Sequence, residues 1–315
     1  MKIGVVGTGF VGSTAAYTLA MQAVGSELVL VDHQPALAQA HGMDILHAVP
    51  FSHPVQIRSG DIADLHGAQL VVVAAGVNQQ PGETRLALLQ RNAGIFSALI
   101  PQIVQAAPDA VLIIATNPLD IMTHIATRIA VAAGLPASRV IGTGTMLDTA
   151  RFRALLGEKL GIASESVHGY VLGEHGDSEV LVWSSVHIGG IPLADFAAAR
   201  GIALDDTLRA AVDHGVRRAA YQIIQGKGAT YFGIASAITA LSRAVLFDER
   251  CVYTVSAMHS EVEGIPSVSL SLPGIIGRNG LTGTLKPVLN AAEHAALQTS
   301  ASVILQHIQA MDAAA

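Results

Sequence analysis

Residues suited to proton transfer stand together in one short stretch, Gly173-Glu174-His175-Gly176-Asp177. His175 follows an apolar run, Val167 to Leu172, which is predicted to form a buried strand. Histidine titrates near neutrality, and a glycine-containing loop at the end of a strand lets a ligand come close. We therefore predict that His175 gives and takes a proton. The alternative is a loop histidine without a chemical role.

A predicted helix from Thr145 to Leu156 carries charged residues that could serve this histidine. Asp148 and Arg151 are three residues apart and would share one face of that helix. An aspartate can orient an imidazole, and an arginine can bind a carboxylate through two parallel hydrogen bonds. An ordinary surface ion pair is the alternative, and the spacing alone leaves it open.

A polar stretch with a glycine, Val77 to Arg85, connects a predicted strand to a predicted helix. Such a connection could be a mobile lid that carries one amide and one cation. The alternative is a solvated connection in which Arg85 has no particular partner.

The beginning of the chain carries a glycine pattern typical of dinucleotide binding. Gly7-Thr8-Gly9-Phe10-Val11-Gly12 lies between an apolar strand and a predicted helix, and Asp32 ends the next strand. Gly7 would permit a tight turn, Gly9 the approach of a pyrophosphate, and Gly12 close packing of helix on strand. Asp32 would accept hydrogen bonds from a ribose and repel a 2′-phosphate, so the expected cofactor is NAD. A glycine-rich turn beside an incidental aspartate is the alternative.

Strands alternate with helices up to Gly142, which predicts an α/β protein with a Rossmann-type, doubly wound parallel sheet. Ligands of such sheets bind at the carboxyl ends of the strands, where Asp32, Gly76 and Asn117 are expected. The pattern then becomes a mixture of long helices and paired strands. We therefore predict a dinucleotide-binding domain over residues 1–142 and a mixed α+β catalytic domain over residues 143–315.

The predicted elements provide the frame for these residues. The strands are expected at 2–6, 27–31, 55–58, 69–75, 110–115, 139–142, 167–172, 253–255 and 268–272. The helices are expected at 13–21, 34–49, 87–107 with a break near Pro101, 120–133, 145–156, 204–224, 228–246 and from Pro287 onward. The apolar stripe of the last helix is expected to consist of Leu289, Ala292, Ala296, Val303, Ile308 and Met311.

Composition excludes several classes of partner. Only 13% of the residues are charged and the formal net charge is −6, which disfavours nucleic acid and anionic membranes. No apolar run reaches the ~18 residues of a membrane span. The single cysteine, Cys251, rules out an internal disulfide and a CxxC motif, fits a cytoplasmic protein, and no metal site is expected. The low charge also suggests that other subunits cover part of the surface.

The motifs together resemble those of the NAD-dependent L-lactate dehydrogenases of the lactate/malate dehydrogenase family, of the bacterial type. The resemblance covers nearly the whole chain. It is carried by the glycine motif 7–12, Asn78 to Arg85, Thr116-Asn117-Pro118, Leu147 to Arg153 and Gly173 to Asp177.

The resemblance implies a role for each residue of the site. His175 would be the proton donor and acceptor with Asp148 as its partner, Arg151 would bind the substrate carboxylate, and Arg85 would polarise the carbonyl. Asn117 would hold substrate and nicotinamide, and Thr230 would lie near the substrate methyl group. The expected contacts of NAD are Gly7, Gly9, Phe10, Val11, Gly12, Asp32, Gly76, Val77, Thr116, Asn117 and Thr143.

The same resemblance implies the reaction and its setting. Pyruvate and L-lactate would be interconverted in glycolysis and fermentation by a cytoplasmic homotetramer. Arg153 and His168 match positions that bind fructose 1,6-bisphosphate at a subunit interface in bacterial members, so allosteric activation is expected.

Gln79 distinguishes between two substrates of the family. The malate branch carries arginine at this position, and a neutral amide cannot pair with the second carboxylate of oxaloacetate. Pyruvate is therefore the expected substrate. A malate or other 2-hydroxy-acid dehydrogenase remains an alternative, as does a non-catalytic NAD(H)-binding scaffold. A short-chain reductase is disfavoured, since Tyr221 and Tyr231 have no lysine four residues later.

Overall fold

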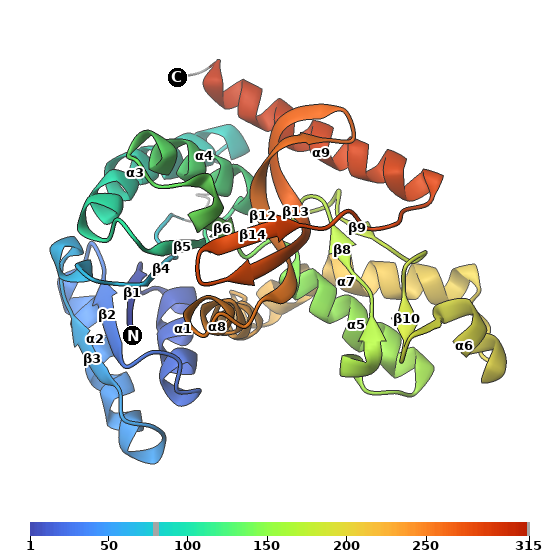
Figure 1. Cartoon of the computed structure of the whole chain (residues 1–315), viewed down its shortest axis with the longest axis horizontal. Helices are drawn as coiled ribbons and strands as arrows, with labels where there is room; N and C mark the ends of the chain where they lie inside the picture. Colours follow the sequence, from blue (N-terminus) through green and yellow to red (C-terminus); the bar gives the residue numbers. More distant parts are fainter. Residues whose placement is uncertain (78–81, 314–315) are drawn as a thin grey trace.

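The computed structural model describes residues 1–77 and 82–313, and a nine-stranded sheet runs through this part of the chain (Figure 1). Its parallel strands are β1 (Lys2–Val6), β2 (Glu27–Val31), β3 (Gln56–Ser59), β4 (Leu70–Val73), β5 (Val111–Ile114) and β6 (Val140–Gly142). An antiparallel extension consists of β12 (Cys251–Val262), β13 (Ile265–Gly277) and β14 (Gly280–Thr284). The order β14-β13-β12-β6-β5-β4-β1-β2-β3 places the switch of direction between β1 and β4. The predicted doubly wound α/β fold is thus confirmed.

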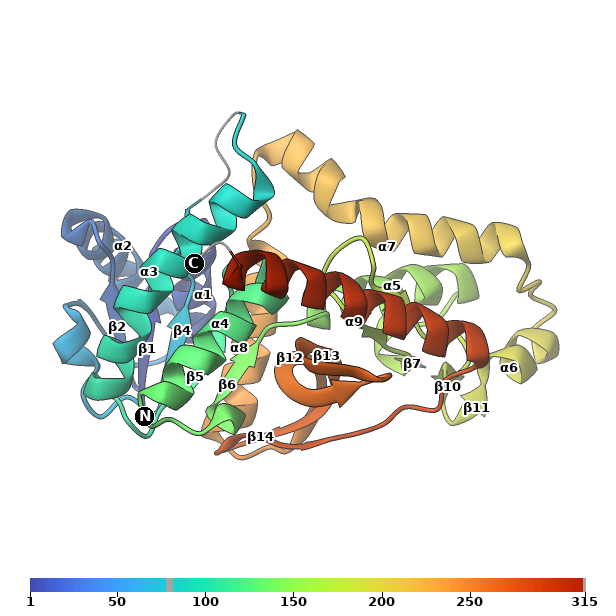
Figure 2. The ribbon, with the colours of Figure 1, turned by 90° about the horizontal axis from the view of Figure 1, so that it is seen from above.

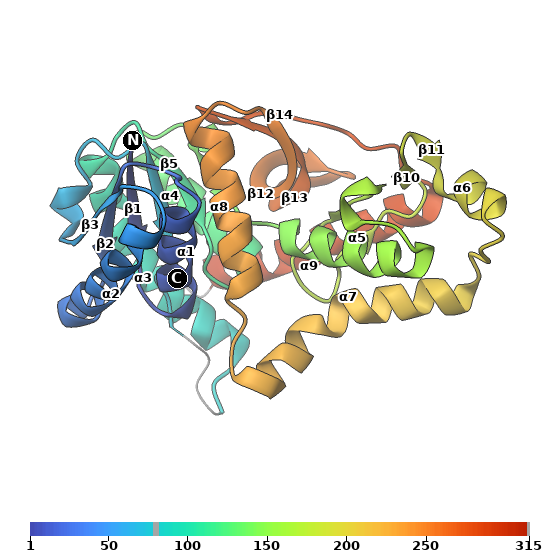
Figure 3. The same ribbon diagram turned by 90° about the horizontal axis from the view of Figure 1, so that it is seen from below.

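Both faces of the parallel strands are covered, which explains their continuous apolar sequences. In β4, Leu70 and Val72 face one side of the sheet and Val71 and Val73 face the other, and all four are fully buried. The first side is covered by α1 (Phe10–Met21), α2 (Pro35–Ala48) and α8 (Phe232–Leu246), and the second by α3 (Arg85–Ala106), α4 (Leu119–Ala132) and α9 (Ala291–Asp312). Figure 2 shows α9 alongside α4, and Figure 3 shows α8 beside α1. Residues from both ends of the chain therefore share one core.

The glycine loop between β1 and α1 is held by close backbone contacts. Gly7 has a φ of 92°, and a Cβ there would lie 2.5 Å from the main-chain nitrogen of Ala75, just beyond β4. A Cβ on Gly12 would overlap the carbonyl oxygen of Gly7. Gly9, by contrast, has no atom within 4 Å of a Cβ built on it. Gly7 and Gly12 are thus required by the close backbone contacts of the turn and the helix. Gly9 instead leaves open space at the start of α1.

The second half of the chain adds a smaller core of its own. Phe152 and Leu156 of α5 (Met146–Leu160) pack with Val212 and Val216 of α7 (Asp206–Lys227). The short elements around them are β7 (Val167–His168), β8 (Val171–Leu172), β9 (Val180–Leu181), β10 (His187–Ile188), β11 (Ile191–Pro192) and α6 (Leu193–Ala199). Single-turn 3₁₀ helices lie at Val49–Phe51, Ile62–Leu65, Ala137–Arg139 and Ser164–Ser166.

The single strand predicted from Val167 to Leu172 is wrong. β7 pairs with β10, whereas β8 pairs with β9, so the run divides between two sheets. Between β7 and β8, side chains of α5 form hydrogen bonds with the main chain. Arg153 donates to the carbonyl of Gly169, and Thr149 accepts from the N–H of Val171. The break lets β8 and β9 form a hairpin whose connecting loop contains His175.

The break predicted near Pro101 is also wrong, because α3 continues through it. A proline inside a helix removes one hydrogen bond and strains the turn before it. Here Ile100 and Ile103, on either side of Pro101, are both fully buried in the larger core. Their burial holds the two halves of α3 in one line.

The last helix begins later than predicted, and the predicted apolar stripe is confirmed only in part: Ile308 is buried, and Leu289 and Met311 are partly buried against the core. α9 begins after Asn290, whose side chain accepts from the N–H of Glu293 while Glu293 accepts from the N–H of Asn290. The buried residues of α9 are Glu293, Leu297, Ser300, Ala301, Ile304 and Ile308. Ala292 and Ala296 of the predicted stripe are exposed. The buried Glu293 also accepts from the N–H of Ser184, and this polar anchor fixes which side of α9 faces inward.

Two further boundaries differ from the prediction. α8 begins at Phe232 rather than at Gly228, because Gly228 has a φ of 84° and ends α7. β12 and β13 are much longer than the two short strands expected. None of the helices described has a segment with the length and hydropathy needed to cross a membrane.

The glycine loop gives a test of the fold. We expect Gly12→Ala to lower the free energy of unfolding by about 2 kcal/mol or more, because the new methyl group overlaps the backbone at Gly7. Thermal and urea unfolding measure this change. Gly9→Ala is the matched control, since its methyl group enters open space, and it should stay within about 0.5 kcal/mol of wild type. Equal losses in the two variants would contradict this description of the loop.

Candidate active site

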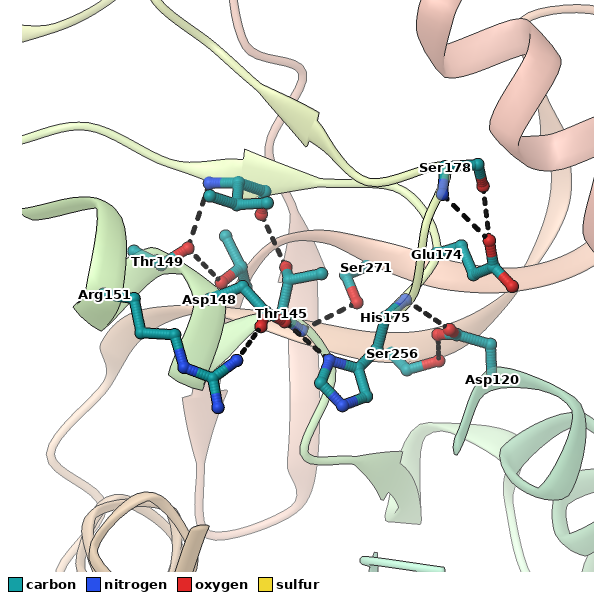
Figure 4. Close-up of polar contacts among 12 residues, drawn as sticks. Asp120, Thr145, Asp148, Thr149, Arg151, Glu174, His175, Ser178, Ser256 and Ser271 are labelled. Atoms are coloured by element: carbon teal, nitrogen blue, oxygen red, sulfur yellow. Dashed lines mark hydrogen bonds and ion pairs between the residues drawn. The ribbon is translucent and has the colours of Figure 1, made fainter. Parts of the chain in front are cut away.

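His175 is positioned by a carboxylate from a different element. The loop between β8 and β9 presents His175, and the first turn of α5 presents Asp148 (Figure 4). Nδ1 of His175 lies 2.6 Å from Oδ2 of Asp148. The side chain of Asp148 is 3% exposed and that of His175 is 26% exposed. The imidazole is thus fixed at one nitrogen and keeps the other for a second partner.

The buried pair shifts the proton affinity of both groups. Burial lowers the pKa of His175, but the charge of Asp148 and its hydrogen bond raise it by more. The charges of Asp120 and Glu179 raise it further, so the pKa of His175 is about 9. Burial raises the pKa of Asp148, whereas the charge of His175, its hydrogen bond and Arg151 together hold it below its ordinary value. The arrangement stabilises an imidazolium beside a carboxylate.

Arg151 lies on the other side of the same carboxylate. Its Nη1 donates to Oδ1 of Asp148 over 2.8 Å, and its side chain is 15% exposed. Asp148 therefore binds His175 with one oxygen and Arg151 with the other, and because it is buried the simple surface ion pair is excluded. Arg151 and Thr230 are among the residues that line one hollow of about 590 Å³. This hollow also contains Leu147, Tyr231 and Phe232, so its walls are largely apolar.

A buried network of hydroxyl groups supports the start of α5. The N–H of Thr145 donates to Ser271 of β13, and its hydroxyl donates to the carbonyl of Val171. Thr149 bonds to Thr254 of β12 through its hydroxyl. These threonines fix Asp148 relative to the hairpin that carries His175. Sequence reasoning missed them, since a threonine in a helix gives no sign of which distant strand it will meet.

Asp120 is a further residue that the sequence analysis missed. It lies in the first turn of α4, is 3% exposed, and accepts a hydrogen bond from the main-chain N–H of His175. The available signal was an acid in an otherwise apolar stretch, Leu119-Asp120-Ile121-Met122. A buried acid needs a partner, but the sequence does not say which.

At the other end of the sheet, Asp32 closes the glycine loop. Its Oδ2 accepts from the N–H and the hydroxyl of Thr8, over 2.7 and 3.0 Å, and its Oδ1 accepts from the N–H of Gln34. Although burial raises the pKa of Asp32, the hydrogen bonds from Thr8 and Gln34 lower it overall. Asp32 therefore carries a negative charge at the carboxyl end of β2, next to the start of α1.

The residues predicted at the ends of β4 and β5 are joined by a buried amide. The side chain of Asn92 in α3, which is fully buried, accepts from the N–H of Val77 and donates to the main-chain oxygen of Asn117. Thr116 donates to the carbonyl of Ala75 over 2.7 Å. Asn92 was not predicted, although it interrupts an apolar helical stripe. That stripe contains Leu89, Phe96, Ile100 and Ile103.

The remaining predicted cofactor residues line the same edge. Gly76 follows β4, and a Cβ there would lie 2.6 Å from the side chain of Thr116. Thr143 follows β6, is buried, and donates its N–H to Ile114. Phe10, in the first turn of α1, is 68% exposed.

A dinucleotide fits this edge on chemical grounds. The open space at Gly9 and the first N–H groups of α1 form an anion-binding cradle, because a helix N-terminus attracts phosphate. The carboxylate of Asp32 lies beyond it, where its negative charge suits a ribose without a 2′-phosphate. Its oxygens already accept from Thr8 and Gln34, and Nδ1 of His33 lies 2.9 Å from Oδ1. Within the described ranges, no cluster of three or more histidine, cysteine, aspartate or glutamate side chains could hold a metal ion.

Two residues of the predicted lid cannot be placed. Gln79 lies outside the described residues, and so does the side chain of Arg85, which is the first residue of α3. Val77 and Thr84, which flank this stretch, are described, and Thr84 caps α3 by accepting from Ala87.

Arg153 contacts the segment of chain that contains His168. Arg153 donates to the carbonyl of Gly169, the residue after His168, and its guanidinium stacks on the ring of Tyr170 at 5.3 Å. His168 is exposed.

The chain matches two protein-family models over almost its whole length. Residues 1–142 match the model described as lactate/malate dehydrogenase, NAD binding domain. Residues 145–314 match the lactate/malate dehydrogenase, alpha/beta C-terminal domain.

Similar proteins and structures carry related names. The L-lactate dehydrogenase of Thermus aquaticus is 59% identical over 306 residues, which are 96% of this chain and 97% of that protein. The L-lactate dehydrogenase of Geotalea daltonii is 51% identical over 99% of this chain and 100% of its own length. A crystal structure of minor L-lactate dehydrogenase from Enterococcus mundtii in the ligands-bound form has a TM-score of 0.93, with 37% identity and 98% of both chains covered.

Proposed function

The chain belongs to the lactate/malate dehydrogenase family, and we propose that it catalyses the reversible reduction of pyruvate to L-lactate with NADH, with His175 as proton donor and acceptor. The observation that carries this proposal is the carboxylate of Asp148, which binds His175 and Arg151 with its two oxygens. One cation suits proton transfer and the other suits an anionic substrate. The names of the similar proteins support the same reaction.

Each polar group has one task in this proposal. Arg151 binds the carboxylate of pyruvate, since a guanidinium matches a carboxylate with two parallel hydrogen bonds. His175, with Nδ1 held by Asp148, donates the proton at Nε2 to the carbonyl oxygen as that oxygen gains charge. Thr230 lies near the substrate methyl group, and Asn117 holds the substrate and the nicotinamide. Arg85 polarises the carbonyl.

NADH, when bound, supplies the hydride that adds to the carbonyl carbon. The residues proposed to hold it follow the edge of the sheet from Gly7, Gly9, Phe10, Val11 and Gly12 through Asp32 to Gly76, Val77, Thr116, Asn117 and Thr143. Asp32 is proposed to accept from the ribose hydroxyls, because its charge excludes the 2′-phosphate of NADP.

The raised pKa of His175 fixes the direction of the pH dependence. A pKa of about 9 keeps the imidazole protonated at neutral pH, which is the form needed to reduce pyruvate. As pH rises through this pKa the proton is lost, so pyruvate reduction falls and L-lactate oxidation is favoured.

We further propose how the chain is organised and where it acts. Residues 1–142 bind the dinucleotide and residues 143–315 carry the substrate chemistry. We place the protein in the cytoplasm, as a homotetramer serving glycolysis and fermentation. The low charge and large exposed apolar side chains such as Phe51 and Val288 agree with a surface that other subunits partly cover.

Gln79 is proposed to exclude oxaloacetate in favour of pyruvate. A second carboxylate enclosed beside a neutral amide would be unpaired, which costs several kcal/mol, or roughly a thousandfold in preference. Pyruvate has a methyl group at this place and avoids the cost.

The reaction and its specificity are tested by NADH oxidation with pyruvate and oxaloacetate. Wild type should prefer pyruvate in kcat/KM, and Gln79→Arg should shift the ratio toward oxaloacetate by about 100-fold or more, because the new guanidinium pairs with the second carboxylate. Gln80→Arg is the matched control, with the same charge one residue away. No turnover of pyruvate by wild type would refute the activity, and an unchanged ratio in Gln79→Arg would refute the role of Gln79.

Arg153 and His168 are proposed to bind fructose 1,6-bisphosphate where two subunits meet. Guanidinium and imidazolium groups bind phosphate, and symmetry would double them around one effector. The contact of Arg153 with the carbonyl of Gly169 supports this proposal, because it holds Arg153 against the residue that follows His168 in the chain.

The effector is tested by pyruvate saturation curves with and without fructose 1,6-bisphosphate. We expect the bisphosphate to lower the half-saturating pyruvate concentration in wild type but not in Arg153→Gln, which has lost the cation. Curves that stay the same at several pH values in wild type would dispose of this proposal.

A further inference from the structure

A cationic hollow on α7 is used by none of the proposed steps. Figure 3 shows α7 at the edge of the molecule, beside α5. The hollow has a volume of about 430 Å³, a size typical of small-molecule sites. The hollow that contains Arg151 and Thr230 is lined by other residues, so the two are separate. The polar and aromatic lining of the cationic hollow consists of Trp183, Arg209, Asp213, His214, Arg217 and Arg218.

The charged residues of this hollow share one side of α7. Arg209, Asp213 and Arg217 are spaced four residues apart, and His214 and Arg218 follow the last two by one position. None of the five is buried. The whole chain has a formal net charge of −6 and only 18 lysines and arginines, three of which stand here between positions 209 and 218. The hollow is thus a concentration of positive charge in an acidic protein.

The acids near the hollow are occupied by Arg217 and its neighbours. Nε and Nη2 of Arg217 donate to the two oxygens of Asp213 over 2.8 and 3.2 Å, and Nη1 donates to the main-chain carbonyl of Asp177 over 2.9 Å. The carboxylate of Asp177 accepts from the hydroxyl of Tyr221 over 3.2 Å. Burial and the charge of Asp148 raise the pKa of Glu179, whose carboxyl group also lies near Arg217, to about 8. Glu179 therefore adds no negative charge here at neutral pH.

The other two arginines keep their charge unpaired. Among the residues that the structure describes, neither Arg209 nor Arg218 has a carboxylate within ion-pair distance. The guanidinium of Arg209 lies 4.9 Å from the ring centre of Trp183, and that of Arg218 lies 5.2 Å from the ring centre of Tyr221. Contacts with an aromatic ring hold a guanidinium in place without neutralising it. Both arginines are thus positioned and still require an anion.

The spacing of the two free cations selects the shape of that anion. Nine residues of α-helix separate them, which is about 13 Å along the axis of α7. A single phosphate would meet one guanidinium fully, whereas a chain of phosphates reaches both. The ring of Trp183 is covered by Arg209 on one face and packs edge-on against the buried Phe152, so it offers no open face to a nucleobase.

We propose that the cationic hollow is a binding site for a linear chain of linked phosphates, held chiefly by Arg209 and Arg218. Guanidinium groups match phosphate oxygens with paired hydrogen bonds, and Arg217 and His214 are further donors in the same hollow. The site is distinct from the proposed effector site at Arg153. It requires no step of the proposed reaction.

Trp183 provides a direct measurement of binding. It is the only tryptophan of the chain, so its emission reports on this hollow. We expect inorganic tripolyphosphate to change that emission with saturation, with a Kd on the order of 0.1 mM at an ionic strength of about 0.1 M. Inorganic phosphate should bind at least about tenfold more weakly, because it spans only one guanidinium. A change that sodium chloride reproduces at the same ionic strength would overturn the proposal.

Arg218→Gln removes one free cation and leaves the contact of Arg209 with Trp183 in place. Arg218 is exposed, so the variant should fold as the wild type does. We expect tripolyphosphate to bind about tenfold more weakly, because a charge-assisted contact is lost. Arg209→Gln should weaken binding as much, and calorimetry measures it because this variant also changes the surroundings of the indole.

Arg200→Gln is the matched control. It removes the same charge at the end of α6, where the guanidinium lies over the ring of Phe196, outside the lining of the hollow. Its Kd for tripolyphosphate should stay within about twofold of wild type. Equal weakening in Arg200→Gln and Arg218→Gln would reduce the effect to net charge and overturn the site.

Two further arms separate this hollow from the other proposed anion sites. Arg153→Gln removes the cation of the proposed effector site, and saturating NAD fills the dinucleotide edge. Neither should alter the Kd of tripolyphosphate by more than about twofold. Binding that is lost in Arg153→Gln and retained in Arg218→Gln would place the ligand at the effector site and contradict the proposal.

The outcomes also separate this proposal from the proposed function. A wild-type protein that binds tripolyphosphate as expected and does not reduce pyruvate would refute the proposed function alone. A wild-type protein that reduces pyruvate, yet shows neither a saturable change in emission nor a heat of binding up to about 10 mM tripolyphosphate, would overturn the polyphosphate site alone.

Discussion

The carboxylate of Asp148 is the interaction on which the candidate site depends. It is almost fully buried, and its cost of desolvation is offset only because His175 and Arg151 each bind one of its oxygens. Those two bonds also fix the relative positions of the proposed proton donor and the proposed carboxylate-binding residue. A buried anion with two cationic partners therefore provides both local stability and the geometry that the proposed reaction needs.

The fold brings this carboxylate to the dinucleotide edge of the sheet. β4 and β5 end beside the glycine loop, and Asn92 joins their ends. Asp120, the second residue of the helix after β5, bonds to His175, so the helix that follows a strand of this edge also holds the loop of the proposed proton donor. The antiparallel strands β12 and β13 add Ser256, which donates to Asp120, and Ser271, which accepts from Thr145. Hydride and proton donors are thus expected to share one rigid frame.

Much of the fold and of the candidate site could be predicted from the sequence where the pattern involves residues close together in the chain. The glycines and Asp32 follow fixed spacings, and Asp148 and Arg151 share a helical face, so their relative positions could be predicted from neighbouring residues. Asn92 and Asp120 could not, because their partners lie on other elements and only the folded chain brings them together.

The wrong elements have the same cause. The run from Val167 to Leu172 has the composition of a strand, yet α5 binds its main chain and divides it. In α9, the buried Glu293 accepts a hydrogen bond from Ser184, and the face that turns inward holds Leu297 and Ile304 in place of Ala292 and Ala296. In both places a distant polar contact prevails over the local hydrophobic pattern.

Proton transfer by His175 is tested most directly by the turnover of His175→Asn at saturating NADH and pyruvate, alongside NADH binding by fluorescence. We expect kcat to fall by about a thousandfold while NADH affinity is retained. A kcat within tenfold of wild type would contradict the proposed role of His175.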